Sequence, residues 1–377
     1  MIQTPGILVT ILAFVLVLGP LVFLHELGHY LAGRWFGVKA EEFSIGFGRE
    51  IAGFTDKRGT RWKFGWLPLG GYVRFAGDMN PASQPSPEWL ALPARERAQT
   101  FQAKPLWQRA IIVVAGPVMN FLIAIVILGG FAVAFGENVT PAKVGGIAAG
   151  SPAALAGLQP GDRITAMNGR QMDDFVDLFM FTAIRAGEPV TIDFERGGQA
   201  RQAQLTIGAV KLKDRFGNIS RRGQLGIAPP PSQARAVALW EAPLSGLRQT
   251  VAIVNFTVEG LKRIILGQIP VSELGGPLKI AKASGESLSM GPLALVNFIA
   301  LVSINLGFIN LLPVPVLDGG HLLFYAVEAV RRRPVEPQVM EWAYRGGLIA
   351  ILALMLFVTF NDLGAFGVWR SLAGLIG

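Results

Sequence analysis

The three histidines of this chain lie in two short motifs that are far apart in the sequence. His25 and His29 belong to the first motif, His-Glu-Leu-Gly-His, and His321 ends the second, Asp-Gly-Gly-His. Two residues four apart share one face of a helix, so His25 and His29 present their imidazoles on the same side. Glu26 stands beside them and can act as a general base toward water on a bound metal. This pattern predicts a catalytic metal site.

The second motif offers the ligand that two imidazoles leave missing. Catalytic zinc takes three protein ligands and a water molecule, and without cysteine the chain must supply imidazole or carboxylate. Asp318 follows two prolines that break an apolar segment, and we expect His25, His29 and Asp318 to bind one Zn²⁺ per chain. The alternative role for Asp318 is to cap a helix over Leu322–Val330. His321 is expected to support the site rather than bind the metal, because three ligands complete it.

The composition places both motifs in a lipid bilayer. Of the 377 residues, 51% are hydrophobic and only 16% are charged, against about 25% charged in soluble domains. Four apolar stretches are long enough, or nearly so, to span about 30 Å of hydrocarbon as helices. They are Ile7–Leu24, Ala110–Phe135, Leu293–Leu312 and Gly346–Phe360, the last extendable back to Trp342. The first is too long for a signal peptide and is expected to be retained. Ionisable residues are costly in such segments, which favours a functional role for the first motif.

The basic residues predict the orientation. They flank the apolar segments, as the positive-inside rule requires of cytoplasmic loops, and form no stripe interleaved with aromatic residues. The net charge of +8 therefore indicates topology and no nucleic-acid partner. We expect the loops Arg34–Arg109 and Arg331–Arg333 in the cytoplasm, and the N-terminus and the region Gly136–Pro292 in a bacterial periplasm. The metal site then lies near the cytoplasmic side of the inner membrane.

The first cytoplasmic loop contains two segments rich in aromatic residues and glycine, Phe43–Gly48 and Arg61–Phe75. Their rough alternation predicts short strands. Their apolarity suggests a β-hairpin associated with the membrane, which is tolerated where it is buried in protein or lines a watery cavity. An ordinary interfacial loop is the alternative, since aromatic belts are common at membrane surfaces.

The periplasmic region predicts one small soluble domain and an amphipathic helix. A short helix, a turn at Pro160-Gly161 and a helix over Phe175–Arg185 alternate with strands over Ile164–Met167, Val190–Glu195 and Ala203–Ile207. With its Gly-Leu-x-x-Gly-Asp and Asn-Gly pieces, this order resembles a circularly permuted bacterial PDZ domain. Such domains bind extended peptides by β-augmentation, here with Gly223–Ile227 as a candidate edge. Leu247–Leu266 is expected to be an amphipathic helix that lies on the bilayer, with packing on the soluble domain as the alternative.

The expected fold is thus a polytopic α-helical membrane protein with about four transmembrane helices, a membrane-associated β-hairpin region and an inserted α+β PDZ domain. Residues 1–135 form the first half of the catalytic core, 136–230 the PDZ domain, 231–290 the amphipathic helix and linker, and 291–377 the second half of the core.

The two motifs together resemble those of the site-2 protease family of intramembrane zinc metalloproteases. That family has His-Glu-x-x-His in its first helix and Asn-x-x-Pro-x-Pro-x-x-Asp-Gly in its third, which here begins at Asn310. The helix layout and the PDZ insertion are similar to the bacterial branch that regulates sigma-E-type envelope stress by cleaving anti-sigma factors. Many members of that branch carry two tandem PDZ domains, whereas the span from Gly136 to Pro230 is too short for two.

The resemblance implies a role for particular residues. His25, His29 and Asp318 would bind zinc, and Glu26 would be catalytic. Asn310 would hold or polarise the substrate near the metal, with an interhelical hydrogen bond as the alternative. Substrate contacts are implied at the residues that match the family's Gly-x-Gly strand, its re-entrant β-loop and its Gly-Pro-x-x-Asn element: Gly46, Phe47, Gly48, Gly70, Gly71 and Asn120. For Asn120, packing between helices is the alternative.

The predicted function is intramembrane zinc endopeptidase. Its substrates would be single-span membrane proteins, either of the anti-sigma-factor type or remnant signal peptides, and its other partners the lipid bilayer and a periplasmic peptide at the PDZ domain. The alternative is a catalytically silent membrane scaffold whose PDZ domain binds peptides, against which the intact Glu26 argues. A metal transporter is disfavoured because the two halves show no internal repeat.

Overall fold

The computed structural model describes residues 6–77, 92–213, 219–271 and 274–365. The chain divides into two compact units. The first, called here the helical unit, contains Met1–Leu128, Pro243–Val254 and Gly275–Asp362. The second, the PDZ unit, contains Gly129–Ala242, Asn255–Leu274 and Leu363–Gly377. Both histidine motifs therefore fall in the helical unit.

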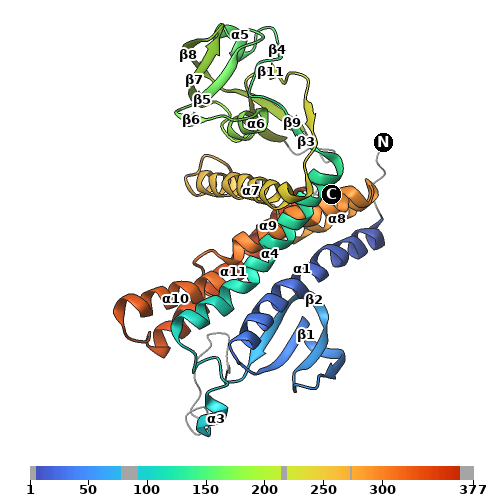
Figure 1. The fold of residues 1–377 in the computed structure, drawn as a ribbon, viewed down its shortest axis with the longest axis vertical. Coiled ribbons are helices and arrows are strands. Elements are labelled where there is room, and N and C mark those ends of the chain that lie inside the picture. The colour runs from blue at the N-terminus through green and yellow to red at the C-terminus, as the bar shows by residue number, and fades with distance from the viewer. Residues whose placement is uncertain (1–5, 78–91, 214–218, 272–273, 366–377) are drawn as a thin grey trace, which may run out of the picture. The chain divides into compact units, whose positions relative to one another are not determined.

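Within the described residues, four helices are long and apolar enough to cross a membrane, as predicted. They are α1 (Ile7–Trp35), α4 (Leu106–Phe135), α9 (Pro292–Asn310) and α11 (Pro337–Ala365) (Figure 1). The first helix continues well past Leu24, so His25, Glu26 and His29 all lie on it. Large apolar side chains such as Val126 and Leu356 are 72% exposed, as contact with lipid requires. The chain is a polytopic helical membrane protein.

The third apolar segment breaks where its prolines predict. α9 ends at Asn310, and after an irregular stretch α10 (Asp318–Arg331) begins. Asp318 is the first residue of α10, and Leu317 holds the cap position without a side-chain bond, so Asp318 is not the helix cap. Side chains at Gly319 and Gly320 would overlap backbone oxygens of the stretch before α10. These two glycines therefore let the irregular stretch fold back against the start of α10.

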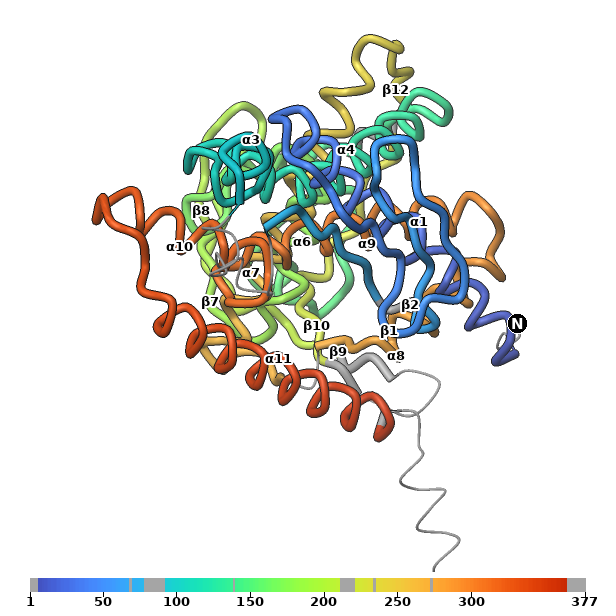
Figure 2. The backbone as a smooth tube through the Cα atoms, turned by 90° about the horizontal axis from the view of Figure 1, so that it is seen from below, coloured from blue at the N-terminus to red at the C-terminus, as the bar shows by residue number. Residues whose placement is uncertain are grey.

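The predicted β-hairpin is present. β1 (Ala40–Thr55) pairs antiparallel with β2 (Arg61–Phe75), and Figures 1 and 2 both show the pair beside α1. Both strands bend, so Phe43 lies opposite Val73 on one side and Trp62 on the other. Residues 71–75 form an outer segment that pairs only with 40–45 among the described strands. Its other edge is free to accept a further strand.

Shorter helices complete the helical unit. α3 (Ala94–Arg97) lies in the loop before α4, and α8 (Pro277–Ser289) packs along α1. Asp362 of α11 is fully buried and accepts hydrogen bonds from the backbone N–H groups of Gly276 and Lys279 at the start of α8. This carboxylate ties α8 to α11.

The PDZ unit has the α+β fold that the sequence predicts. Its main sheet has the order β6-β5-β7-β8, with β5 (Arg163–Met167), β6 (Arg170–Gln171), β7 (Pro189–Arg196) and β8 (Gln199–Thr206). Asn168 and Gly169 form the tight turn between β5 and β6, both with positive φ. α5 (Pro152–Leu155) and α6 (Phe175–Ala183) cover a core that includes Ile164, Leu178 and Ile192.

The remaining described elements are three two-stranded sheets, a short 3₁₀ helix and one long helix. The strand pairs are β3 (Glu137–Val139) with β12 (Gln233–Arg235), β4 (Gly146–Ile147) with β11 (Ile227–Ala228), and β9 (Gly208–Lys213) with β10 (Ile219–Gln224). A turn of 3₁₀ helix, η1 (Leu239–Glu241), leads into α7 (Ala242–Ile265).

The amphipathic helix α7 contacts the soluble domain through charged residues. Arg263 pairs with Glu188, and Glu259 lies 2.5 Å from Arg185 and 3.0 Å from Arg263. The end of α7 therefore packs on the soluble domain, and the expected position of the helix on the bilayer stays a prediction. Ile253 and Val254, nearer the start of α7, pack in the helical unit against a cluster that includes Ala300.

Candidate metal centre

The structure brings His25, His29 and Asp318 together at the start of α10. Nε2 of His25 lies 3.3 Å from Nε2 of His29 and 3.3 Å from a carboxylate oxygen of Asp318. Nε2 of His29 lies 3.5 Å from the other oxygen of Asp318. All three side chains are at most 18% exposed. Among the described residues, this is the one group of His, Asp or Glu whose ligand atoms could share a metal ion.

These separations fit a tetrahedral zinc ion. Ligand atoms at about 2.0–2.1 Å from tetrahedral zinc stand about 3.3 Å from one another. The two imidazole nitrogens are 3.3 Å apart, and they lie 3.3 and 3.5 Å from the two oxygens of Asp318, so all three distances are close to that value. Two imidazoles and one carboxylate are also a donor set of catalytic zinc sites, which keep their fourth position for water.

Helix α4 contacts the far side of both imidazoles without giving a ligand. Nδ1 of His29 lies 2.9 Å from the carbonyl oxygen of Ile112, and Nδ1 of His25 lies 3.0 Å from the side-chain amide of Asn120. Gly116 lies between Ile112 and Asn120 on α4, and a side chain at Gly116 would overlap Nε2 of His29. α1 and α4 meet closely at this level, because a side chain at Gly28 would overlap the carbonyl oxygen of Ala115.

Glu26 lies at the edge of a cavity of about 560 Å³ that the three ligand residues also line. The outer segment of the hairpin forms one wall, with Gly71 packed against Glu26 so closely that an added Cβ would stand 2.9 Å from its Cγ. The backbone N–H of Val73 also interacts with the Glu26 carboxylate. The free strand edge, the carboxylate and the three ligands therefore border one space.

Asn310 and His321 line the same cavity from α9 and α10. The amide nitrogen of Asn310 is 3.5 Å from Nε2 of His25. His321 turns its ring toward Tyr344 of α11, whose hydroxyl lies 2.8 and 2.9 Å from its two nitrogens. Burial lowers the pKa of His321 to about 4, so the ring is neutral at pH 7. Its nitrogens thus face α11, and its supporting role stays a prediction.

The six predicted substrate-contact residues divide into three groups. Phe47, Gly70 and Gly71 line the cavity, and the ring of Phe47 stacks on Tyr72. Gly46 and Gly48 do not belong to the cavity lining but lie against β2 with φ of 87° and 84°. A side chain at Gly46 would stand 2.8 Å from the carbonyl oxygen of Leu67, and one at Gly48 would overlap the indole of Trp66. These two glycines let β1 cross β2 closely. Asn120 is fully buried against His25.

Sequence reasoning missed three residues of the site. The carbonyl of Ile112 has no side-chain signature and could not have been found. Gly116 opens the Gly-Pro-x-x-Asn element that drew attention to Asn120, so its position in that element was the available signal. Tyr344 lies in an ordinary-looking apolar helix, and only the tertiary contact with His321 marks it.

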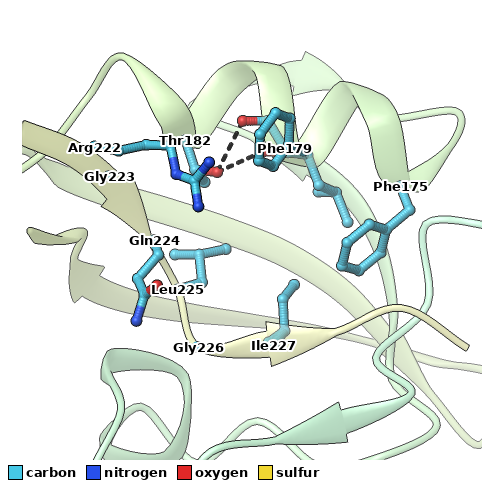
Figure 3. Close-up of a pocket in the computed structure, with 10 residues that line it drawn as sticks. Phe175, Phe179, Thr182, Arg222, Gly223, Gln224, Leu225, Gly226 and Ile227 are labelled. Atoms are coloured by element: carbon cyan, nitrogen blue, oxygen red, sulfur yellow. Dashed lines mark hydrogen bonds between the residues drawn. The ribbon is translucent and has the colours of Figure 1, made fainter. Parts of the chain in front are cut away.

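The PDZ unit contains a separate groove, between α6 and the segment 223–227 (Figure 3). Its volume is about 190 Å³, and its apolar walls include Phe175, Phe179 and Ile227. Gly223 limits one end, because a side chain there would overlap the carbonyl oxygen of Thr182. The segment expected to form a peptide-binding edge thus borders a groove.

A family model and several relatives match most of this chain. The model of the family described as Peptidase family M50 matches residues 13–354. A protein of Agrobacterium fabrum, provisionally named a zinc metalloprotease, is 41% identical over 360 residues that cover 94% of this chain and 96% of that protein. Metalloprotease MmpA of Caulobacter vibrioides is 37% identical over 98% of this chain and 99% of its own length. Among solved structures, the PDZ domain of an SdrC-like protein from Listeria monocytogenes matches 25% of this chain and 90% of its own, at 22% identity and a TM-score of 0.19.

Proposed function

The chain belongs to peptidase family M50, the site-2 protease family, and is a zinc metalloprotease; on that premise we propose that it cuts transmembrane segments of single-span membrane proteins. The observation that carries the proposal is the convergence of two imidazoles and two carboxylates at the end of apolar helices. Ionisable groups in such a setting are too costly to keep without a function. We propose as substrates proteins of the anti-sigma-factor type and remnant signal peptides.

His25, His29 and Asp318 would hold one zinc ion per chain. Bound there, zinc would polarise a scissile carbonyl and lower the pKa of water. Glu26 follows the ligand His25 in sequence and borders the same cavity, so its carboxylate is placed to take a proton from water and pass it to the leaving amine. Asn310 lines the same cavity and has an amide that can donate a hydrogen bond to a substrate carbonyl.

The hairpin supplies a place for the substrate backbone. A transmembrane helix satisfies its amides internally and shields its carbonyls, so the segment to be cut must first unwind. An unwound segment can pair with the outer edge of residues 71–73, which no described strand occupies and which borders the cavity beside Glu26. Because Gly70 and Gly71 have no side chains, the ring of Phe47 and the side chain of Glu26 pack directly against the backbone of this edge.

Glu26→Gln tests the catalytic assignment. The enzyme is purified in detergent and mixed with a single-span substrate, and zinc content and cleavage are measured together. We expect zinc content to be unchanged and cleavage to fall at least about 100-fold, because only the proton acceptor is lost. Glu341→Gln, on an exposed face of α11, is the matched control and should cleave normally. Cleavage by Glu26→Gln at the wild-type rate would support a different catalytic group.

We propose in addition that the groove of the PDZ unit binds an extended peptide in register with β11. Phe179 is 47% exposed at this groove, so Phe179→Asp should abolish binding of a peptide library with apolar C-terminal residues. Binding equal to that of the wild-type chain would contradict a peptide site in this groove.

We also propose that the PDZ unit faces the periplasm and that the loop after α10 faces the cytoplasm. The basic cluster Arg331–Arg333 supports this orientation. Because the native chain has no cysteine, single cysteines can report it cleanly. In spheroplasts, an impermeant maleimide should label Gln204→Cys in the PDZ unit and leave Arg333→Cys unlabelled. The reverse pattern would overturn the orientation.

A further inference from the structure

The two imidazoles of the candidate zinc site require hydrogen-bond acceptors on their outer nitrogens. A histidine that binds metal through Nε2 must carry its proton on Nδ1, and that N–H needs an acceptor when buried. For His29 the acceptor is the carbonyl oxygen of Ile112, 2.9 Å away. A carbonyl can only accept, so this contact fixes the tautomer of His29 with Nε2 free for a ligand bond.

His25 presents the same requirement at Asn120. Its Nδ1 lies 3.0 Å from the side-chain nitrogen of Asn120, while its Nε2 points to His29 and Asp318. An amide N–H donating to Nδ1 would leave the proton on Nε2, which is incompatible with metal binding. The oxygen and nitrogen of an asparagine amide are assigned from their hydrogen bonds, and turning the amide places Oδ1 on Nδ1. In the present orientation of the amide, Oδ1 has no hydrogen-bond partner among the described residues. Rotating the amide therefore breaks no hydrogen bond to Oδ1.

Asn120 is held firmly in this place. Its side chain is fully buried, its backbone oxygen accepts a hydrogen bond of 2.7 Å from Ser303, and its Cβ packs near Gly307 of α9. Ile112, Gly116 and Asn120 are spaced by four residues and therefore share one face of α4. On this face, Ile112 contacts His29 and Asn120 contacts His25. Gly116 lies between them, where α4 is closest to the two imidazoles.

We propose that Asn120 is a positioning residue for zinc binding, whose Oδ1 accepts the Nδ1–H of His25 and holds that ring in the ligating tautomer. α4 then orients both imidazoles while giving no ligand itself. This inference rests on the proposed zinc role of His25, and it replaces the substrate contact that the sequence suggested for Asn120 with a contact behind the metal site.

The test compares Asn120→Asp with Asn120→Leu in the full-length detergent-solubilised chain. Zinc affinity is measured by competition with a chromogenic chelator, and cobalt is substituted to record the ligand-field spectrum. Leucine keeps the volume and removes the acceptor, so zinc affinity should fall about 10- to 100-fold. Aspartate can only accept, so its affinity should stay within a few-fold of wild type, with an unchanged cobalt spectrum. A merely structural amide predicts the opposite order, because a buried charge is the more disruptive replacement.

Two further variants separate the possible failures. Gly130→Ala, also on α4, adds a methyl group that would meet nothing within 4 Å and leaves the Asn120 amide unchanged, so zinc affinity should not change. Asn120→Asp with zinc affinity as low as that of Asn120→Leu, or Asn120→Leu with wild-type affinity, would overturn the role of Asn120. If His25→Ala also binds zinc like wild type, the ligand assignment itself is wrong, which is a failure of the proposed function instead.

Discussion

Replacing Gly116 by alanine should disable the metal site through one methyl group. The Cβ would overlap Nε2 of His29, the atom that faces the other ligands, and would stand 2.5 Å from its Cε1 and 2.9 Å from Cε1 of His25. Carbon atoms in contact prefer about 3.5–4.0 Å, so the His29 ring must move by roughly 1 Å. Metal sites tolerate about 0.2 Å in their ligand distances. The movement therefore removes His29 from the ligand set.

Separation of the two helices offers no escape from this clash. If α4 moved away by the same distance, the hydrogen bond from His29 to Ile112 would lengthen from 2.9 Å beyond a normal range. Movement of the ring would remove His29 as a ligand, and movement of α4 would remove the hydrogen bond that orients it. We therefore expect zinc affinity to fall by at least about 100-fold, or about 2.7 kcal/mol.

The assay is chelator competition on purified protein, with zinc content measured by mass spectrometry. Gly130→Ala, also on α4, is the matched control, because its Cβ would meet nothing within 4 Å. That substitution should leave zinc binding unchanged and favour the helix slightly, since alanine is the better helix former. Wild-type zinc affinity in Gly116→Ala would refute the close contact between α4 and the imidazoles.

Three other predictions follow from the same structure. Gly71→Ala places a methyl group 2.7 Å from the carbonyl oxygen of Ser44 and 2.9 Å from Cγ of Glu26, so the hairpin edge and the Glu26 side chain must shift. Cleavage should fall about 100-fold with zinc content unchanged, and parallel loss of zinc would contradict this. Tyr344→Phe removes the hydrogen bond to His321 and should lower the free energy of unfolding by about 1 kcal/mol in thermal unfolding, whereas an unchanged midpoint would show that the bond contributes nothing. Burial raises the pKa of Asp162, but the stronger effects of its ion pair and backbone hydrogen bond lower the pKa below 3.8, so its contribution to stability is present above about pH 4 and lost as the pH falls further. Asp162→Asn should flatten that acid dependence, read by hydrogen exchange in β5 of the full chain, and an unaltered profile would exclude Asp162 as its source.

Much of the fold could be predicted because its signals are local. The length of the apolar stretches predicted the four long helices, and the prolines after Asn310 predicted the break before Asp318. Alternation and turn residues marked the hairpin and the strands around Asn168. The first helix begins at Ile7 as predicted, but its C-terminal end was not predicted, because the polar motif that ends the apolar run does not end the helix, which continues to Trp35.

The sequence by itself determined the kind of chemistry. Spacing put His25 and His29 on one helix face with Glu26 beside them, and the absence of cysteine left imidazole and carboxylate as ligands. Only the tertiary structure decided how these groups are held. Ile112 acts through a backbone carbonyl that every residue possesses, and Asn120 through a contact across 95 positions of sequence. The close contact of α4 with both imidazoles depends on the absence of a side chain at Gly116. Only the folded structure shows which atoms occupy the space where that side chain would lie.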